Sequence, residues 1–414
     1  MSRIGGLYRR LNQWIKLQGY KAEYYLESRS DYFLHTLGGG CSQSRLSHHS
    51  HEEWHSRVSD GPAPTDRVAF FVAFHPNKEA PASNIRYIRA LRKCGFAIAY
   101  IHNGPLEESS IEKLQEHCWN VICRENIGQD FGAWKDAYLE YTRLGKLDKT
   151  SWLLICNDSN YFLGARHGDE FTELMRFHLS NEDSDLICSN LNQEMWPHYQ
   201  SFFLCFHRRV FTSESFSSFW REYKPFTNRY YAINAGEIKL TSSVLHGAKA
   251  AILYQSPSCA FHIKEASATP AEILKYAPKH CLFLVNQLAQ ASMTTRDIED
   301  IDIHRILSLL DLYNPSHAYA LLFSKYSLSP FLKKDLVKHG VFSLTQIANC
   351  LESSGFSIDS LAYNEIISGY VRTSNHTSFI NRRRQAYRQG INPENGVQFT
   401  VYPKSLKALG FRLD

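Results

Sequence analysis

Apolar runs in the first half of the chain alternate with stretches of helical periodicity. Continuous apolar segments predict buried strands at 67–74, 97–101 and 120–123. Between the first two, apolar residues recur at helical spacing and predict a helix over 83–93. Strands that alternate with helices are typical of an α/β fold with a mostly parallel sheet. We therefore expect a Rossmann-type, mostly parallel sheet.

The clearest unit is a helix followed by a strand. Apolar residues recur at helical spacing from Phe131 to Tyr141, and Asp130 stands just before them. A carboxylate there accepts hydrogen bonds from the amides of the first helical turn. Residues 152–156 are continuously apolar, as expected of a central strand covered on both faces. The strand ends in Asn157-Asp158-Ser159, so it should deliver polar side chains to the crevice where open α/β sheets bind ligands.

Two polar clusters flank this unit, and each has two interpretations. Asn126-Ile127-Gly128 precedes the helix, and Asn157-Asp158-Ser159 follows the strand. Both contain residue types that cap helices and close strands, so local structure alone explains either cluster. Taken together, in this order, they also fit a ligand site at one edge of the sheet. The pattern by itself leaves both interpretations open.

The remaining elements suggest three parts of the chain. The pattern predicts strands and helices in alternation up to about residue 253: a helix at 169–179, a strand at 185–189, a strand at 202–206, a helix at 207–223, a helix at 236–245 and a strand at 248–253. From Pro270 onward no strand pattern is convincing, and helices are predicted at 271–291, 301–312, 317–324 and 331–339. We expect an N-terminal helix and polar linker at 1–64, an α/β domain at 65–265 and a mainly helical region at 266–414.

Residues 1–28 predict a basic amphipathic helix. Its apolar residues, Trp14 among them, fall on one face, and its arginines and lysines fall on the other. This pattern suits the headgroup region of an anionic membrane, but it also suits packing on the α/β domain or on a second subunit. The linker that follows holds four histidines without cysteines at ligand spacing, so we predict no metal site there.

Composition narrows the class of protein. The net charge of +5 arises from 46 basic and 41 acidic residues, too even a balance to indicate nucleic-acid binding. The ten cysteines form no Cys-x-x-Cys pair, and several lie in apolar segments where a free thiol behaves as a small hydrophobe. No apolar run reaches the roughly 18 residues that span a bilayer, and no signal peptide is recognisable. We expect a cytoplasmic protein, peripheral on the inner face of the cytoplasmic membrane.

Several ordered motifs resemble the rhamnan synthesis protein F family. They run over most of the chain, from about Arg67 to about Val341: His198-Tyr-Gln-Ser-Phe-Phe203, Phe216-Ser-Ser-Phe-Trp220, Gly236-Glu-Ile-Lys-Leu-Thr241, and Asn314-Pro-Ser-His317 with Pro330-Phe-Leu-Lys-Lys-Asp-Leu336. The resemblance implies a GT-A-like glycosyltransferase that takes part in making rhamnose-containing bacterial surface polysaccharides, such as O-antigen or capsule. One position departs from the family pattern, because Gly236 stands where an aromatic residue is expected.

The resemblance also implies roles for the polar clusters. In GT-A glycosyltransferases an Asn-x-Gly turn, a helix, a strand and an acidic turn bind the diphosphate of a nucleotide sugar. Asp158 would orient that diphosphate, either directly or through Mg²⁺ or Mn²⁺, which prefer oxygen ligands. Glu237 alone reads as a first-turn glutamate of a helix. With the resemblance it becomes the general base that deprotonates the acceptor.

The other candidate residues divide by the part of the substrate they would contact. His75 follows the first strand, where a nucleotide base or ribose would lie, and Trp196 offers an aromatic face to a sugar or is simply packed in its loop. The remaining substrate-binding candidates are Asn126, Gly128, Asp130, Trp134, Lys135, Asn157 and Ser159 on the donor side, and His198, Gln200 and Ser201 on the sugar or acceptor side.

Three hypotheses of function follow. The first is a glycosyltransferase that moves a sugar, plausibly rhamnose, from a nucleotide diphosphate to a lipid-linked or polysaccharide acceptor. The second is a carbohydrate-binding or scaffolding subunit that keeps the fold without catalysis, because fold does not imply function. The third is a phosphoryl- or glycosyl-phosphate transferase that uses the same acidic turn.

Overall fold

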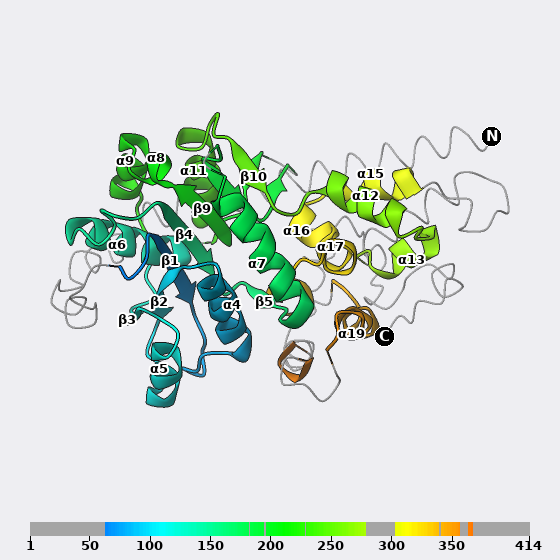
Figure 1. Ribbon diagram of the computed structural model, residues 1–414, viewed down its shortest axis with the longest axis horizontal. Helices are drawn as coiled ribbons and strands as arrows, with labels where there is room; N and C mark the ends of the chain where they lie inside the picture. Colours follow the sequence, from blue (N-terminus) through cyan, green and yellow to red (C-terminus); the bar gives the residue numbers. More distant parts are fainter. Residues whose placement is uncertain are drawn as a thin grey trace, which may run out of the picture.

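A computed structural model describes residues 63–278 except 182, 194, 195 and 228, together with 303–338, 341–356 and 363–366 (Figure 1). The predicted helix at 1–28 and the histidine-containing linker lie outside the described residues. Within the described residues, no helix has both the length and the apolar character needed to cross a membrane.

The centre of the fold is a seven-stranded sheet with the order β10-β6-β9-β4-β1-β2-β3. Its strands are β1 (Arg67–Ala73), β2 (Ala97–Asn103), β3 (Asn120–Arg124), β4 (Trp152–Asn157), β6 (Leu186–Cys188), β9 (Phe203–His207) and β10 (Ala250–Ile252). Strand β9 runs antiparallel to both β4 and β6, and every other neighbouring pair is parallel. The predicted mostly parallel α/β sheet is confirmed.

Helices cover both faces of this sheet (Figure 1). In the α/β part they are α4 (Ala82–Lys93), α5 (Glu108–Gln115), α6 (Gln129–Arg143), α7 (Ala165–Leu179), α8 (Arg208–Phe211), α9 (Glu214–Glu222), α10 (Arg229–Tyr231) and α11 (Lys239–Ser243). The single helix predicted over 207–223 is in fact two, because the Ser213 side chain accepts a hydrogen bond from the Phe216 amide and so caps the start of α9.

The side chains of β1 alternate between two clusters of the core, one on each face of the sheet. Val68, Phe70 and Val72 pack with α6 and α9, whereas Ala69 and Phe71 point to the opposite face and pack with α4 and α7. All five side chains are fully buried. A central strand buried on both faces accounts for the continuous apolar run in the sequence.

The C-terminal part of the described chain joins the second of these clusters. Its elements are α12 (Ser256–Glu265), α13 (Pro270–Lys275), α15 (Ile303–Leu310), α16 (Pro315–Ala318), α17 (Ala320–Ser327), β11 (Phe331–Lys333), α18 (Lys334–Lys338) and α19 (Leu344–Ser353). Ile273, Leu307 and Tyr319 belong to the same buried cluster as Phe71. A further buried cluster, with Leu332 and Ile347, is formed mainly by the C-terminal part and includes Tyr161 and Leu163. The boundary between 265 and 266 stays a prediction.

The helix predicted over 331–339 is wrong at its start. Phe331–Lys333 forms strand β11, which pairs antiparallel with β5 (Asn160–Phe162), and a helix begins only at Lys334. Phe331 also packs edge-on against Phe162, with ring centroids 5.7 Å apart. A partner strand from a distant part of the chain supplies hydrogen bonds that the local pattern cannot reveal.

The helix predicted to begin at Gly236 begins earlier. A π-helical segment, η2 (Ala232–Ile238), lies between α10 and α11, so Glu237 stands inside a longer helical run and not in a first turn. The expectation that first-turn amides hold its carboxylate is therefore wrong. π-Helical turns are uncommon and occur frequently at functional sites.

Gly236 leaves room for an aromatic ring supplied from elsewhere. A Cβ atom at this position would lie 2.8 Å from the nearest atom of the Phe131 ring. Phe131, near the start of α6, thus fills the space beside η2. This contact gives a physical reason why the chain has glycine where the family resemblance predicts an aromatic residue.

We predict that Gly236→Ala destabilises the protein by roughly 1–3 kcal/mol, the usual cost of overpacking a buried site. Gly168→Ala is the matched control, because its Cβ would meet its nearest neighbour at an ordinary 3.5 Å within α7. Replacing glycine by alanine in a helix should stabilise by about 0.5–1 kcal/mol. Denaturant unfolding measures both. A Phe131→Leu background should reduce the cost at Gly236, and equal costs in both backgrounds would contradict the contact.

Candidate active site

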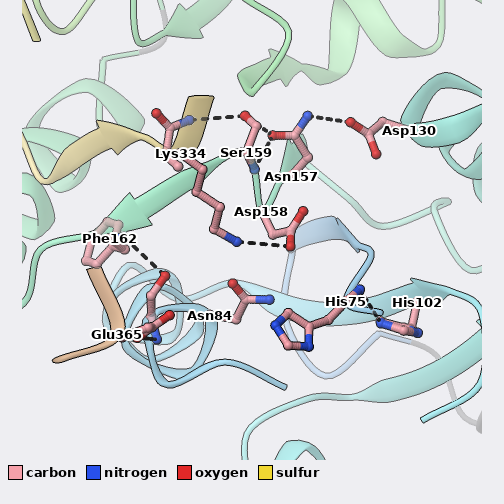
Figure 2. A network of polar contacts seen from close by, with 12 residues as sticks. His75, Asn84, His102, Asp130, Asn157, Asp158, Ser159, Phe162, Lys334 and Glu365 are labelled. Carbon is pink, nitrogen blue, oxygen red and sulfur yellow. Dashed lines mark hydrogen bonds and ion pairs between the residues drawn. The ribbon is translucent and has the colours of Figure 1, made fainter. Parts of the chain in front are cut away.

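Polar side chains gather where the parallel strands end. Asn157 ends β4 and is followed by Asp158 and Ser159, and His75 lies just after β1. The segment before the antiparallel strand β9 brings Gln200 and Ser201 to the same edge. Figure 2 shows part of this cluster, with Lys334 reaching Asp158 from a distant segment. The carboxyl edge of a mostly parallel sheet is where such folds bind ligands.

Asn157 links the acidic turn to helix α6. Its side-chain oxygen accepts hydrogen bonds from the Ser159 amide at 3.1 Å and the Ser159 hydroxyl at 2.7 Å. Its side-chain nitrogen donates to Oδ2 of Asp130 at 2.7 Å (Figure 2). The turn after β4 is therefore fixed in shape, and it is joined to the first turn of α6 by one amide side chain.

Asp130 does not cap helix α6 as the sequence predicted. The N-cap is Gly128, with no side-chain cap, and the Asp130 carboxylate accepts from Asn157 instead. Burial, and next the negative charge of Asp158, raise the pKa of Asp130 to about 7. The charge of Glu237 raises it further, while Asn157 and Arg124 oppose the shift. Three carboxyl groups thus share one edge of the sheet and influence one another.

Asp158 is paired with a lysine that the sequence analysis did not select. Nζ of Lys334 lies 3.1 Å from Oδ2 of Asp158, and the two side chains are only 13% and 15% exposed. The Lys334 amide also donates to the Ser159 carbonyl at 2.9 Å. Strand pairing between β5 and β11 therefore delivers this lysine to the acidic turn. Lys334 lies in the family-like motif 330–336, but the sequence assigned it no role because its partner is 176 residues away.

Glu237 is held by two residues of the His198–Ser201 segment. One of its carboxylate oxygens accepts hydrogen bonds from the hydroxyl of Ser201 and from the Ser201 amide, and the other lies 3.5 Å from Nε2 of His198. Nδ1 of His198 is 2.7 Å from the Trp196 carbonyl oxygen, which only accepts, so Nδ1 carries a proton. This arrangement fixes the imidazole with Nε2 toward the carboxylate.

Gln200 connects this group to the C-terminal part of the chain. Its amide nitrogen lies 3.3 Å from Nε2 of His198, and its amide oxygen accepts from the Ser316 hydroxyl at 3.2 Å. Asn314 caps helix α16 by accepting from the Ser316 amide, as the Asn-Pro-Ser-His motif predicted. The motif is therefore both a helix start and a support for the site.

His75 lies beside the acidic turn, and its backbone is held by a second histidine. The His75 amide donates to Nε2 of His102 at 3.0 Å, while Nδ1 of His102 lies 2.9 Å from the Gly104 carbonyl oxygen. Burial is the main cause that lowers the pKa of each histidine; for His75 the charge of Lys334 lowers it further. The preceding residue, Phe74, is 49% exposed and stacks with His102, and sequence reasoning missed it.

Two predicted donor-side residues have other contacts. Trp134 is fully buried in the core, where its ring meets Phe131 edge-on. Nζ of Lys135 donates to the carbonyl oxygens of Arg221 and Tyr223, at the end of helix α9. These contacts attach α6 to α9, so we leave both residues out of the site.

The Asn126-Ile-Gly turn owes its shape to packing. Gly128 has φ +71°, and a Cβ atom there would lie 2.3 Å from Cβ of Pro225. Its amide donates to the Thr227 hydroxyl at 3.0 Å. Only glycine fits this approach without strain. Asn126 and Trp196 are exposed, Trp196 to 59%, and both stay open to a ligand.

The cluster does not fit a divalent cation well. Mg²⁺ usually binds through one or two carboxylates together with substrate phosphates, and the described residues contain no larger group of three or more carboxylate, imidazole or thiol side chains that could hold a metal. Asp158 already has Lys334 as its counter-charge, and Asp130 is bonded to Asn157. We therefore derive no step through a metal ion.

We predict that Asp130→Asn changes the pH dependence of stability. The folded protein keeps a proton on Asp130 that an ordinary carboxyl, with a pKa of 3.8, has lost. The unfolded state therefore binds fewer protons between about pH 4 and pH 7, and wild-type stability falls as pH rises through that window. The asparagine variant should gain roughly 1–3 kcal/mol relative to wild type between about pH 5 and pH 8.

Denaturant unfolding at about pH 5 and about pH 8 measures the free energies of unfolding of wild type and of Asp130→Asn. Asp183→Asn, at an exposed position, is the control and should show no such gain. If the difference between Asp130→Asn and wild type is the same at both pH values, Asp130 is not protonated in the folded protein.

Comparison with solved structures finds glycosyltransferases at low similarity. A mannosyltransferase from Pyrobaculum calidifontis, solved with GDP-Man and Mn²⁺, is 11% identical with a TM-score of 0.30, over 88% of this chain and 100% of the other. Mouse xyloside xylosyltransferase 1 is 8% identical with a TM-score of 0.27, over 47% and 86%. S. aureus TarS is 11% identical with a TM-score of 0.25, over 78% and 92%. Likenesses this weak carry no further argument.

Comparison of sequences finds similarity over part of the chain. An uncharacterized protein of Sinorhizobium fredii is 26% identical over 190 residues, which cover 45% of this chain and 48% of that protein. The chain thus spans about half the length of the curated relative that it matches. Residues 98–279 match the sequence profile described as Rhamnan synthesis protein F, and this range holds the acidic turn, Glu237 and the segment that supports it. Over residues 98–279 the chain is therefore similar to the rhamnan synthesis protein F family.

Proposed function

We propose that the protein is a glycosyltransferase of bacterial surface polysaccharide synthesis. It moves a sugar, with rhamnose as the leading candidate, from a nucleotide diphosphate to a lipid-linked or polysaccharide acceptor. The observation that carries the proposal is the Glu237 carboxylate, held by Ser201 and His198 at the same sheet edge as Asp158. The family match over 98–279 supports the same class of reaction.

In this proposal Glu237 is the general base. An acceptor hydroxyl oxygen attacks the anomeric carbon and forms the new glycosidic bond, while its proton passes to the Glu237 carboxylate. The bond between the anomeric carbon and the phosphate oxygen breaks, and its electron pair leaves with the nucleoside diphosphate. The Glu237 side chain is 19% exposed, which leaves it reachable by a hydroxyl.

The supporting residues orient that base. Ser201 and His198 contact different oxygens of the carboxylate, so its rotation is restricted. Gln200 is held in turn by Ser316 and limits the position of the His198 ring. Such fixed geometry contributes to catalysis by placing the base before the acceptor arrives. Trp196, exposed beside His198, is proposed to stack on the apolar face of a sugar.

The donor is proposed to lie along the other half of the edge. The diphosphate lies at the Asn157-Asp158-Ser159 turn, near Asn126, and the nucleoside extends toward His75 and Phe74. Phe74 is exposed and already parallel to the His102 ring, which suits stacking on a base. Asp130, with its pKa near 7 chiefly through burial, is in part a neutral carboxyl at physiological pH and repels the diphosphate less than a full charge would.

We predict that Glu237→Gln lowers kcat by roughly 100- to 10,000-fold, because glutamine keeps the size of the side chain but accepts no proton. Donor affinity, measured by titration, should stay near that of wild type. Glu222→Gln, at an exposed position on α9, is the control and should leave kcat unchanged. The assay measures transfer from a panel of nucleotide sugars to lipid-linked and polysaccharide acceptors.

Other outcomes at Glu237 would change the assignment. Loss of donor affinity with a normal rate at saturation would make Glu237 a donor ligand, and His198 would be the next base to test. If wild type binds a nucleotide sugar but transfers it to none of the acceptors, the non-catalytic subunit is the better hypothesis. Transfer of a sugar phosphate would favour the phosphotransferase.

We propose a membrane partner for residues 1–28, from their basic amphipathic pattern. Deleting them should abolish flotation with liposomes that contain anionic lipid and leave activity on a soluble acceptor unchanged. Liposomes of neutral lipid are the control, because the basic face should not bind them. A lower melting temperature with unchanged flotation would instead favour packing of this segment on the protein.

A further inference from the structure

Strand β11 holds one lysine against the acidic turn. Lys334 follows β11, its amide donates to the Ser159 carbonyl, and its ammonium lies 3.1 Å from the Asp158 carboxylate. With side chains 13% and 15% exposed, the pair is largely shielded from water but reachable from the sheet edge. The lysine is therefore not a mobile surface charge. It is presented at a set position by strand pairing.

A second lysine, Lys333, lies close enough to the proposed base Glu237 for their charges to interact. Nζ of Lys333 stands 5.8 Å from the centre of the Phe202 ring. Burial lowers the pKa of Lys333, while the charge of Glu237 raises it. Two consecutive lysines from β11 and α18 thus face two of the three carboxylates at this edge. The positive charge that a metal would bring is already present in the chain.

The free donor capacity of Lys334 suits a phosphate. An ammonium has three N–H donors, and the Asp158 contact uses one of them. The others remain for oxygens of a diphosphate at the Asn157-Asp158-Ser159 turn. Hydrogen bonds between an ammonium and a phosphate are charge-assisted and stronger than neutral ones.

We propose that Lys334 is the counter-ion of the donor diphosphate in place of a divalent cation, and that Asp158 positions this lysine. The proposal rests on the proposed function, since it assumes that a nucleotide diphosphate occupies the edge. According to this proposal, the protein binds a nucleoside diphosphate without a metal ion. The C-terminal part of the chain then supplies an essential group to the α/β sheet.

The two possible roles of Asp158 predict opposite effects of one substitution. If Asp158 ligates a metal, Asp158→Asn removes a ligand, and diphosphate binding weakens. If Asp158 only positions Lys334, its charge repels the diphosphate and competes for the ammonium. Asp158→Asn should then leave binding unchanged or strengthen it, because the asparagine oxygen still accepts from Lys334.

The experiment is a titration of the full chain with UDP, GDP and dTDP, in excess EDTA and again with Mn²⁺. We expect at least one of them to bind with an affinity that EDTA changes by less than about threefold, a shift of under 1 kcal/mol. Lys334→Gln should weaken that binding by about tenfold or more, as expected for loss of a charge-assisted hydrogen bond. Lys338→Gln, at an exposed position on α18, is the matched control and should bind like wild type.

A charge-preserving variant serves as the control for a folding defect. Lys334→Arg keeps the positive charge and should restore most of the binding lost in Lys334→Gln. Loss of binding in both variants, with a melting temperature that is also lowered in both, would show that Lys334 supports the fold and overturn the proposal.

The remaining outcomes separate the two proposals. Binding that requires Mn²⁺ and is lost in Asp158→Asn would overturn the role of Lys334 and leave the glycosyltransferase proposal standing. Absence of binding by all three nucleoside diphosphates, with and without Mn²⁺, would overturn both.

Discussion

The site depends on how the repulsion among three carboxyl groups is offset. Asp130, Asp158 and Glu237 share one edge of the sheet, and the charges of the latter two help raise the pKa of Asp130, whose main cause is burial. A different interaction offsets the repulsion at each carboxyl group. Asp130 keeps a proton near neutral pH, Asp158 pairs with Lys334, and Glu237 accepts hydrogen bonds from Ser201. Buried carboxylates without such partners would cost several kcal/mol.

Some of these interactions come from distant parts of the chain, and they tie the C-terminal part to the α/β sheet. Pairing of β11 with β5 sets the position of Lys334, and the cap of α16 sets the position of Ser316 against Gln200. Phe331 packs among aromatic rings from α4, β5 and α7. Removing the region after residue 265 would therefore remove core side chains and polar contacts of the site together.

The π-helical segment also helps to set the position of Glu237. It places Glu237 within a helical run, opposite the segment before β9, while Gly236 accepts the Phe131 ring at close range. Phe131 belongs to helix α6, whose second residue is Asp130. One aromatic contact thus joins the backbone that carries the proposed base to the helix that carries Asp130. A change in this packing would alter both groups.

The sequence by itself determined the strands of the central sheet, most of the helices and the polar clusters proposed as the site. Their signals are local: continuous apolar runs mark buried strands, helical spacing marks amphipathic helices, and Asn157-Asp158-Ser159 stands visibly at a strand end. Only the tertiary structure identified Lys334, because its partners lie 176 residues away, and only it gave Asp130 a raised pKa, because desolvation depends on what surrounds a group. It also moved Trp134 and Lys135 from the site to the packing of α6. Periodicity shows which face of a helix is buried, but the partner that covers that face is decided by the fold.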